Sequence, residues 1–498
     1  MQLIGMEPIR RRVEPAMDEW ILDHFDEFEN RRNPEAFLKD FLRESTKFAI
    51  LSHRWSNDEM TFQDLLKLSR ITGQGINSYT QQQKLDKIQL TSAEVIDKLV
   101  ELSGGQTRSL QEPPLLSQLT AFLPHIPHCT GLVKLVNFCA LALNSHHCNL
   151  AWIDTCCIDK TSSAELDEAI RSMFRWYRGS AICIIHLADT ETKDWPGSTE
   201  TPDLWFSRGW TLQELLAPPI VKFYSSRWKE FTTASNDKSD EPFTSVIRSP
   251  RQDTEYYDHY KDKSMVDWLS EVTKVPAKDL LHFRPGLSNL RQRLAWSSSR
   301  LTTRVEDMAY CLLGIFNVNL SIAYGEGDMS YYRFQRAIME QSNDRGLFQW
   351  YGHPSTLSSM LAKEPKCFSS DRQPIDTDAV TSLVDPTFML TNHGLRLSVS
   401  LFSKEFSINW LNKVMAANSY SRSIWDKLGE ADKTIHEAFR LAILGYSKGM
   451  PVTFMLIQQQ IRGHICYTRF PGDSENLVGK PADEWASEVG KPEIIYIR

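Results

Sequence analysis

The sequence predicts an α/β protein: a mostly parallel sheet with flanking helices, followed by a helical block and a β-rich C-terminal domain. Three observations lead to this fold class. Short apolar runs alternate with helical patterns between residues 131 and 224, which is typical of a parallel sheet covered on both faces. A polar, partly helical connection over residues 229–290 leads to a block with helical spacing that extends to about residue 342. After residue 353 the period becomes two, as in half-buried strands.

The N-terminal part predicts a helical lead-in, a buried strand and a long insertion. Residues 1–46 contain helix-like apolar spacing from residue 17 onward. Residues 47–52 form a short apolar run that ends in a polar cluster, which indicates a buried strand and the loop after it. Residues 69–130 are rich in Gln, Ser, Gly and Thr, and are predicted to be mostly an insertion or long loop.

A regular strand–helix pattern follows. The expected strands are residues 150–154, 181–187 and 220–224, and the expected helices are residues 132–143, 164–178 and 208–216. The second of these helices has the strongest pattern, because Ser162 and Glu165 have the spacing of a capping box and an apolar stripe follows them. Gly179 is expected to end it.

The second half of the chain predicts helices and then strands. Residues 305–316 and about 330–342 have helical spacing, with a turn at residues 324–328 between them. Residues 395–401 alternate apolar and polar side chains, and residues 452–457 and 493–497 are also expected to be extended. The predicted division is 1–46 lead-in, 47–228 first α/β domain, 229–350 helical region and 351–498 β-rich domain.

Composition and charge exclude several classes of protein. The 498 residues are 41% hydrophobic, far from a disordered composition. The net charge of −7 argues against nucleic acid as a partner. The nine cysteines lack disulfide-scaffold spacing, which favours a reducing compartment. No apolar run is long enough for a membrane span, so a soluble, cytoplasmic protein is expected.

Three polar clusters are expected at the carboxyl ends of the strands, where ligands bind in open parallel sheets. They are residues 52–55, residues 154–159 and residues 205–215. Trp210 and Glu214 are four residues apart on an expected helix and so share a face. An aromatic surface beside one carboxylate suits a planar ring that carries positive charge.

Several motifs within these segments resemble the successive motifs of the fungal heterokaryon incompatibility (HET) domain. They are FAILSHRW (48–55), LAWIDTCCIDK (150–160), ELDEAIRSMFRWYRGSAICIIHLAD (165–189) and WFSRGWTLQELLAP (205–218). Residues 293–338 look like the segment that commonly follows this domain. The resemblance covers roughly residues 47–342 discontinuously; the insertion and the C-terminal part depart from it.

This resemblance implies a fungal protein that acts in non-self recognition and triggers programmed cell death. It implies self-association and a sensor, on the same chain or in a partner protein. HET domains are thought to be distant relatives of the Toll/interleukin-receptor (TIR) domain, a flavodoxin-like fold, and several TIR domains hydrolyse NAD. Their catalytic glutamate lies in a W-C-L-x-E-L motif, which Trp210 to Leu215 resembles, with Thr211 in place of Cys.

The expected site follows from this resemblance. Cleavage of the nicotinamide–ribose bond expels a neutral base, so Glu214 alone could stabilise the oxocarbenium-like transition state. Ser52 and Arg54 are expected to contact ribose or phosphate, and Trp55 or Trp210 to stack on a ring. No metal and no resident cofactor are expected, and NAD enters only as a substrate.

Structural alternatives remain open for each residue. Glu214 can be a helix glutamate paired with Arg208, the tryptophans can be core residues, and Arg54 can be an ordinary ion-pair partner. Structural roles are favoured for Asp154 and Asp159. His146, His147 and nearby cysteines offer soft ligands, but buried thiols are favoured over zinc. The rival function is a non-enzymatic signalling module that acts through homotypic contacts.

Overall fold

The structure, a computed structural model, describes eleven stretches of the chain. They are residues 4–5, 47–66, 130–148, 150–192, 201–242, 263–368, 387–417, 438–447, 450–461, 464–469 and 486–498. The expected lead-in (except residues 4–5) and the insertion (except residue 130) therefore lie outside the described residues. The chain divides into two compact units, Met1–Arg284 and Pro285–Arg498. The four-part domain division stays a prediction.

The first unit is built on a mostly parallel sheet, as predicted. Its parallel strands lie in the order β3-β2-β4-β5, and β1 pairs antiparallel with β3. The strands are β1 (Ile4–Gly5), β2 (Phe48–His53), β3 (Leu150–Trp152), β4 (Ile182–His186) and β5 (Val221–Tyr224). Taken in chain order, the four parallel strands are arranged 2-1-3-4, as in the first four strands of flavodoxin-like sheets.

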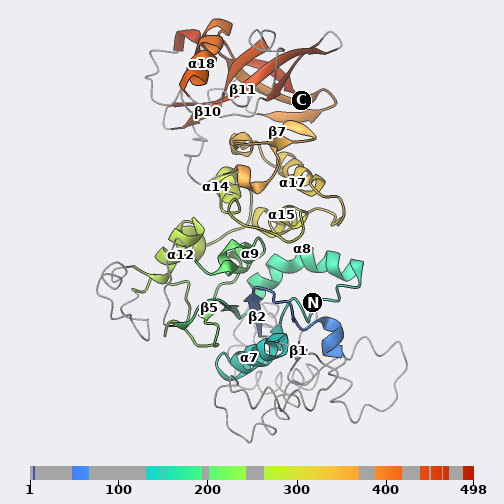
Figure 1. Cartoon of the computed structure of the whole chain (residues 1–498), viewed down its shortest axis with the longest axis vertical. Helices are drawn as coiled ribbons and strands as arrows, with labels where there is room; N and C mark the ends of the chain where they lie inside the picture. Colours follow the sequence, from blue (N-terminus) through green and yellow to red (C-terminus); the bar gives the residue numbers. More distant parts are fainter. Residues whose placement is uncertain are drawn as a thin grey trace, which may run out of the picture. The chain divides into compact units, whose positions relative to one another are not determined.

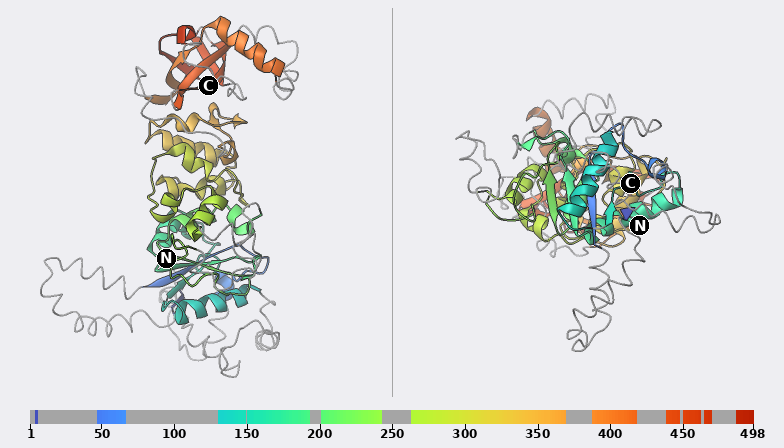
Figure 2. Two further views of the ribbon diagram at one scale, coloured as in Figure 1. Left: turned by 90° about the vertical axis from the view of Figure 1, so that its left-hand side faces the viewer. Right: turned by 90° about the horizontal axis from the view of Figure 1, so that it is seen from below.

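Helices cover both faces of this sheet (Figures 1 and 2). α7 (Thr130–Asn144) packs against β2 and β3, and Figure 1 shows α8 (Ser163–Gly179) and α9 (Thr211–Leu216) on the opposite side. The Trp152 ring on β3 lies 5.4 Å from the Trp176 ring on α8, centroid to centroid. Nearly every residue of the parallel strands is buried, because both faces are covered.

Two local details differ from the sequence-based expectation. The helix expected at residues 208–216 starts at Thr211, and a separate 3₁₀ turn, η4 (Leu204–Ser207), precedes it. The capping box on α8 is only half formed. Ser162 accepts from the Glu165 N–H at 3.3 Å, but the Glu165 carboxylate accepts from the backbone N–H of Asp159 instead of that of Ser162.

Among the described residues, two helices follow β5 in the first unit, and short helices begin the second. The first unit ends with α12 (Met265–Thr273) and α13 (Ala277–Leu281). The second unit contains α14 (Leu290–Ala295), α15 (Asp307–Tyr310), α16 (Leu313–Phe316), α17 (Met329–Met339), η5 (Arg345–Phe348), η6 (Pro365–Cys367) and the hairpin of β6 (Pro354–Ser355) and β7 (Ser358–Ala362). The single helix expected at residues 305–316 is thus divided into α15 and α16.

The expected turn at residues 324–328 is present. Gly325 and Gly327 have φ angles of +99° and +58°, which glycine adopts readily. The Glu306 carboxylate accepts hydrogen bonds from both of their backbone N–H groups, at 2.8 and 3.1 Å. This glycine pair therefore has a structural role.

The C-terminal part is β-rich, as predicted. Its six strands lie in the order β10-β11-β12-β13-β9-β8, and an additional β10–β9 pairing closes the sheet on itself. They are β8 (Phe388–Thr391), β9 (Gly394–Leu401), β10 (Phe439–Ser447), β11 (Met450–Ile461), β12 (His464–Arg469) and β13 (Glu493–Ile497). α18 (Lys404–Ala417) packs against β10 (Figure 1). Its Trp410 and Leu411 belong to one apolar cluster with residues of that strand. The short turn η11 (Ala486–Glu488) precedes β13.

Two further findings concern the described residues only. No described helix combines the length and the apolar character that a membrane crossing requires. The eight described cysteines are all buried free thiols. Burial raises the pKa of Cys139 to about 12 and that of Cys148 to about 11, so both thiols are protonated at neutral pH.

Gly131 is a glycine in the described part of the first unit that leaves no room for an added methyl group. Its missing Cβ would lie 2.4 Å from the Asp58 carbonyl oxygen and 2.5 Å from the Met60 nitrogen. Gly131→Ala is therefore expected to lower the free energy of unfolding by about 1–3 kcal/mol, as measured by denaturant unfolding. Gly179→Ala is the matched control, because no atom lies within 4 Å of its added Cβ. Equal effects of the two substitutions would contradict this packing.

Candidate active site

The structure brings Ser52 and Glu214 into direct contact, although 162 residues separate them. Ser52 is fully buried near the carboxyl end of β2. Its hydroxyl donates to the Glu214 carboxyl Oε2 at 2.5 Å. Glu214 lies on α9 and is half-buried. The end of a central strand and a short helix therefore meet at one carboxyl group.

Side chains outside α9 fix its position. A six-residue helix is not stable on its own. At its start the buried Thr211 hydroxyl lies 2.7 Å from the Trp205 carbonyl oxygen and 2.9 Å from that of Arg208. At its end the Lys238 ammonium donates to the carbonyls of Leu215 and Pro218, at 3.1 and 2.7 Å. Thr211, the departure from the W-C-L-x-E-L pattern, thus joins the helix to the preceding turn.

Trp205 orients Ser52. Its ring is completely buried, and its indole N–H donates to the Ser52 hydroxyl at 2.8 Å. Since the hydroxyl accepts from Trp205, its own hydrogen is available to point at Glu214. Sequence analysis did not single out Trp205 as a site residue, because a buried tryptophan in an aromatic segment has the same pattern as a core residue.

Burial and a neighbouring anion keep Glu214 protonated at neutral pH. Burial is the largest effect and raises the pKa of Glu214 to about 8, and the negative charge of Asp154 adds to the rise. The Ser52 hydrogen bond, the positive charge of Arg208 and the Tyr177 hydroxyl oppose the rise but do not cancel it. An uncharged carboxyl that ionises just above neutral pH is typical of a functional site.

Arg54 and Trp55 follow β2 and have polar partners. The Arg54 guanidinium donates to Asp189 Oδ1 at 2.8 Å, and both side chains are partly exposed. The Trp55 ring is 45% exposed, its N–H donates to Asp154 Oδ2 at 2.8 Å, and the Lys160 ammonium lies 3.7 Å from the ring centroid. The guanidinium carbon of Arg208 lies 5.5 Å from the same centroid. These cations gather around one exposed aromatic ring.

Trp210 is the residue immediately before α9 and is half-buried. Its carbonyl accepts from the backbone N–H groups of Gln213 and Glu214, at 3.2 and 3.4 Å. The backbone of Trp210 and Glu214 therefore has the hydrogen bond expected of residues four apart on a helix. A role for the Trp210 ring in binding stays a prediction, as do the binding roles of Ser52, Arg54 and Trp55.

His53 and Asp154 belong to the polar clusters expected at the strand ends, but their contact with each other and with Lys134 was not expected from the sequence. His53 Nε2 lies 3.0 Å from Asp154 Oδ1, and His53 Nδ1 lies 3.0 Å from the Lys134 ammonium on α7. Lys134 also binds the carboxylate of Glu59. A structural role was favoured for Asp154, and its partners are side chains of this chain, His53 and Trp55. These contacts join residues about 80 to 100 positions apart, for which the sequence gives no signal.

The other polar residues in these segments have local partners. Asp159 Oδ1 accepts from the backbone N–H and the hydroxyl of Thr161, at 2.9 and 2.6 Å, so it orders its own loop. His146 Nε2 lies 2.8 Å from the Tyr224 hydroxyl. Within the described ranges no three His, Cys, Asp or Glu side chains are grouped as a metal site requires. The expectation of no metal stays a prediction.

Comparison with known proteins identifies the domain. Residues 128–204 match the family model described as heterokaryon incompatibility protein (HET). The chain carries a HET domain. The chain is also 38% identical over 199 residues, 39% of its length, to the "Vegetative incompatibility protein HET-E-1" of Podospora anserina. It spans only 13% of that relative. No solved structure matches the chain.

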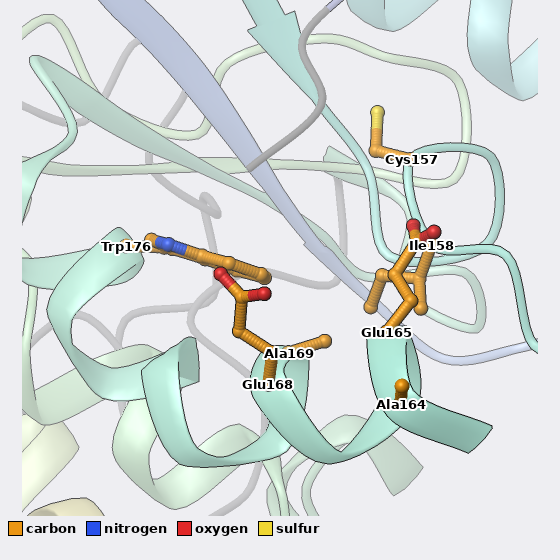
Figure 3. A pocket seen from close by; sticks show the side chains of 7 residues that line it. All are labelled: Cys157, Ile158, Ala164, Glu165, Glu168, Ala169 and Trp176. Carbon is orange, nitrogen blue, oxygen red and sulfur yellow. The ribbon is translucent and has the colours of Figure 1, made fainter. Parts of the chain in front are cut away.

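The matched part of the HET domain includes a cavity that is distinct from the contact between Ser52 and Glu214. Its volume is about 310 Å³, and it lies along α8. Figure 3 shows the Trp176 ring and the Glu168 carboxylate side by side, with Glu165, Ile158 and Cys157 across from them. Ser52 and Glu214 lie outside the matched range 128–204.

The raised pKa of Glu214 makes stability depend on pH in a defined direction. An unfolded glutamate loses its proton near pH 4.5, whereas the folded Glu214 keeps it to about pH 8. Between these values the folded state binds more protons, so the stability contributed by this group falls as pH rises. Glu214→Gln removes this pH dependence, because glutamine does not ionise. The Tm of the variant minus the Tm of the native chain should therefore increase by several degrees as pH rises from about 5 to 8.

The matched control for this measurement is Glu168→Gln, an exposed glutamate on α8. It should leave the difference in Tm from the native chain independent of pH over the same range. If Glu214→Gln behaves like this control, Glu214 has an ordinary carboxyl pKa in the folded protein, and the electrostatic description of the site is wrong.

Proposed function

We propose that this chain is a fungal effector of non-self recognition in heterokaryon incompatibility, and that its HET domain hydrolyses the nicotinamide–ribose bond of NAD to trigger programmed cell death. Self-association, driven by a sensor partner, activates it. The match to the HET family and the similarity to a vegetative incompatibility protein support the biological role. Cell death and self-association rest on the family resemblance.

The contact between Ser52 and Glu214 is the observation that carries the enzymatic part. It places one carboxyl group at the carboxyl end of a central parallel strand, where ligands bind in sheets of this strand order. The strand order 2-1-3-4 and the segment Trp210 to Leu215 are also those expected of a TIR-like domain. Ser52, held by Trp205, is suited to a ribose hydroxyl.

The charges around Glu214 favour a ligand with a cationic ring and anionic phosphates. A cationic ring beside Glu214 lowers its pKa, so the carboxyl ionises as the ligand binds. The resulting carboxylate stabilises the oxocarbenium-like ribose as the neutral base departs and water attacks. Lys160 and Arg208 lie over the Trp55 ring, and together with Arg54 they can attract a pyrophosphate.

Nicotinamide release from the clustered full-length chain tests this proposal. The purified protein, fused to an inducible oligomerisation tag, is mixed with NAD and the products are separated by chromatography. We expect release on clustering, and a loss of about 10²–10³-fold in kcat for Glu214→Gln. Below about pH 8, kcat/KM for the native chain should rise close to tenfold per pH unit, because the ionised carboxyl is the active form.

The rival function, a non-enzymatic signalling module, predicts a different outcome. Under that function clustering kills cells without nicotinamide release, and Glu214→Gln leaves toxicity unchanged. The exposed control Glu168→Gln should retain both release and toxicity if the enzymatic proposal holds. Toxicity that persists in Glu214→Gln, together with no detectable release by the native chain, would sink the enzymatic proposal.

A further inference from the structure

One lysine of α7 is buried against the segment that follows β2. The Lys134 side chain is only 8% exposed. Its ammonium group lies 3.0 Å from His53 Nδ1, donates to the Arg54 carbonyl at 3.2 Å and binds the Glu59 carboxylate. An ammonium group has three hydrogens and no acceptor, so these three partners use its full donor capacity. The Lys134 ammonium is therefore held from three directions.

Two of these contacts hold both ends of residues 54–59. Lys134 binds the backbone of Arg54 at the start of this segment and the side chain of Glu59 at its end. Between these ends, the Ser56 backbone N–H donates to the same Glu59 oxygen at 2.7 Å. One ammonium group on α7 therefore fixes the course of the segment that leaves β2.

The third contact reaches Trp55 through two other side chains. Because the Lys134 ammonium can only donate, His53 Nδ1 accepts and the ring hydrogen lies on Nε2, which is 3.0 Å from Asp154 Oδ1. The other oxygen of Asp154 accepts from the Trp55 N–H at 2.8 Å. A neutral His53 ring thus orients the carboxylate that holds the Trp55 ring.

The supported segment carries two of the residues that are predicted to bind the ligand. The Arg54 side chain is 32% exposed and Trp55 is 45% exposed, whereas Lys134 is buried. Lys134 supports Arg54 through its backbone and Trp55 through His53 and Asp154. It therefore acts on both residues from the protein interior.

Stability gives a weaker explanation of this buried ion pair than geometry does. Removal from water penalises the charges of both Lys134 and Glu59, and apolar residues in place of a buried ion pair often leave stability equal or higher. Apolar residues would make none of the directed hydrogen bonds to His53 and Arg54. The pair is accounted for by the geometry that it imposes on the segment.

We propose that Lys134 is a positioning residue of the candidate active site: it fixes the segment after β2 so that Arg54 meets the phosphates of the ligand and Trp55 meets one of its rings. The proposal deepens the proposed function and rests on it for the identity of the ligand, a dinucleotide. The effect of Lys134 on the segment does not depend on the reaction.

A measurement without ligand tests this effect in the full chain. The protein is labelled with fluorotryptophan, and the fluorine NMR resonance of Trp55 is the one absent in Trp55→Phe. Lys134→Met should shift or broaden this resonance and leave the other tryptophan resonances in place. The double variant Lys134→Met/Glu59→Gln should do the same, and it leaves no unpaired carboxylate in the interior. An unmoved Trp55 resonance in either folded variant would overturn the proposal, as would a failure of both variants to fold.

Lys222 and Asp237 provide a matched control. They form another buried pair of a lysine and a carboxylate in the first unit, with 3.2 Å between Nζ and Oδ1. Lys222→Met/Asp237→Asn should leave the Trp55 resonance in place. A shift of that resonance in the control would also overturn the proposal, because the loss of any buried ion pair would then have the same effect.

The kinetics of NAD hydrolysis by the clustered chain give a second readout. Lys134→Met/Glu59→Gln should raise KM about tenfold or more and change kcat less than about threefold, because binding is weakened while the chemistry at Glu214 is untouched. Glu59→Gln alone keeps an acceptor for Lys134 and should leave KM close to the native value. Hydrolysis with an unchanged KM in the double variant would overturn the present proposal alone. A Trp55 resonance that moves in a protein that does not hydrolyse NAD disproves the proposed function and leaves the effect of Lys134 on the segment intact.

Discussion

The hydrogen bond from Ser52 to Glu214 is the interaction on which the rest of the site depends. It joins the buried end of a central strand to a six-residue helix that has too few turns to be stable alone. That helix forms because Thr211 ties its start to the preceding turn and Lys238 binds the carbonyls at its end. Tertiary contacts therefore set the position of Glu214. These contacts hold its carboxyl group in a place where burial disfavours the charged form.

The electrostatics of the site follow from two carboxyl groups in unlike surroundings. Asp154 lies within hydrogen-bond distance of His53 and accepts from Trp55, whereas burial is the largest effect on Glu214, which accepts from Ser52. Their pKa values, about 2 and about 8, therefore separate in opposite directions.

Much of this architecture could be predicted from the sequence, and the missing parts have identifiable causes. The apolar runs at residues 150–154 and 181–187 predicted buried parallel strands because strands covered on both faces need no polar side. Ser52 and Glu214 were singled out because strand ends and a family motif mark them, and the structure brings them into contact, while their roles stay a prediction. Lys134 lies within an expected helix, and nothing in the sequence marks its contact with His53, 81 residues away, because that contact exists only once the sheet has formed. The helix expected from residue 208 begins only at Thr211. The sequence does not reveal this, because the 3₁₀ turn before it is also rich in apolar residues.

Direct titration of the Glu214 carboxyl group tests the central claim, that this group is held uncharged at neutral pH. The full chain, labelled with carbon-13 at its glutamate carboxyl carbons, is followed by NMR as pH is raised, and the resonance of Glu214 is the one absent in Glu214→Gln. We expect a midpoint near pH 8. A midpoint near 4.5, the ordinary value for a glutamate, would contradict it.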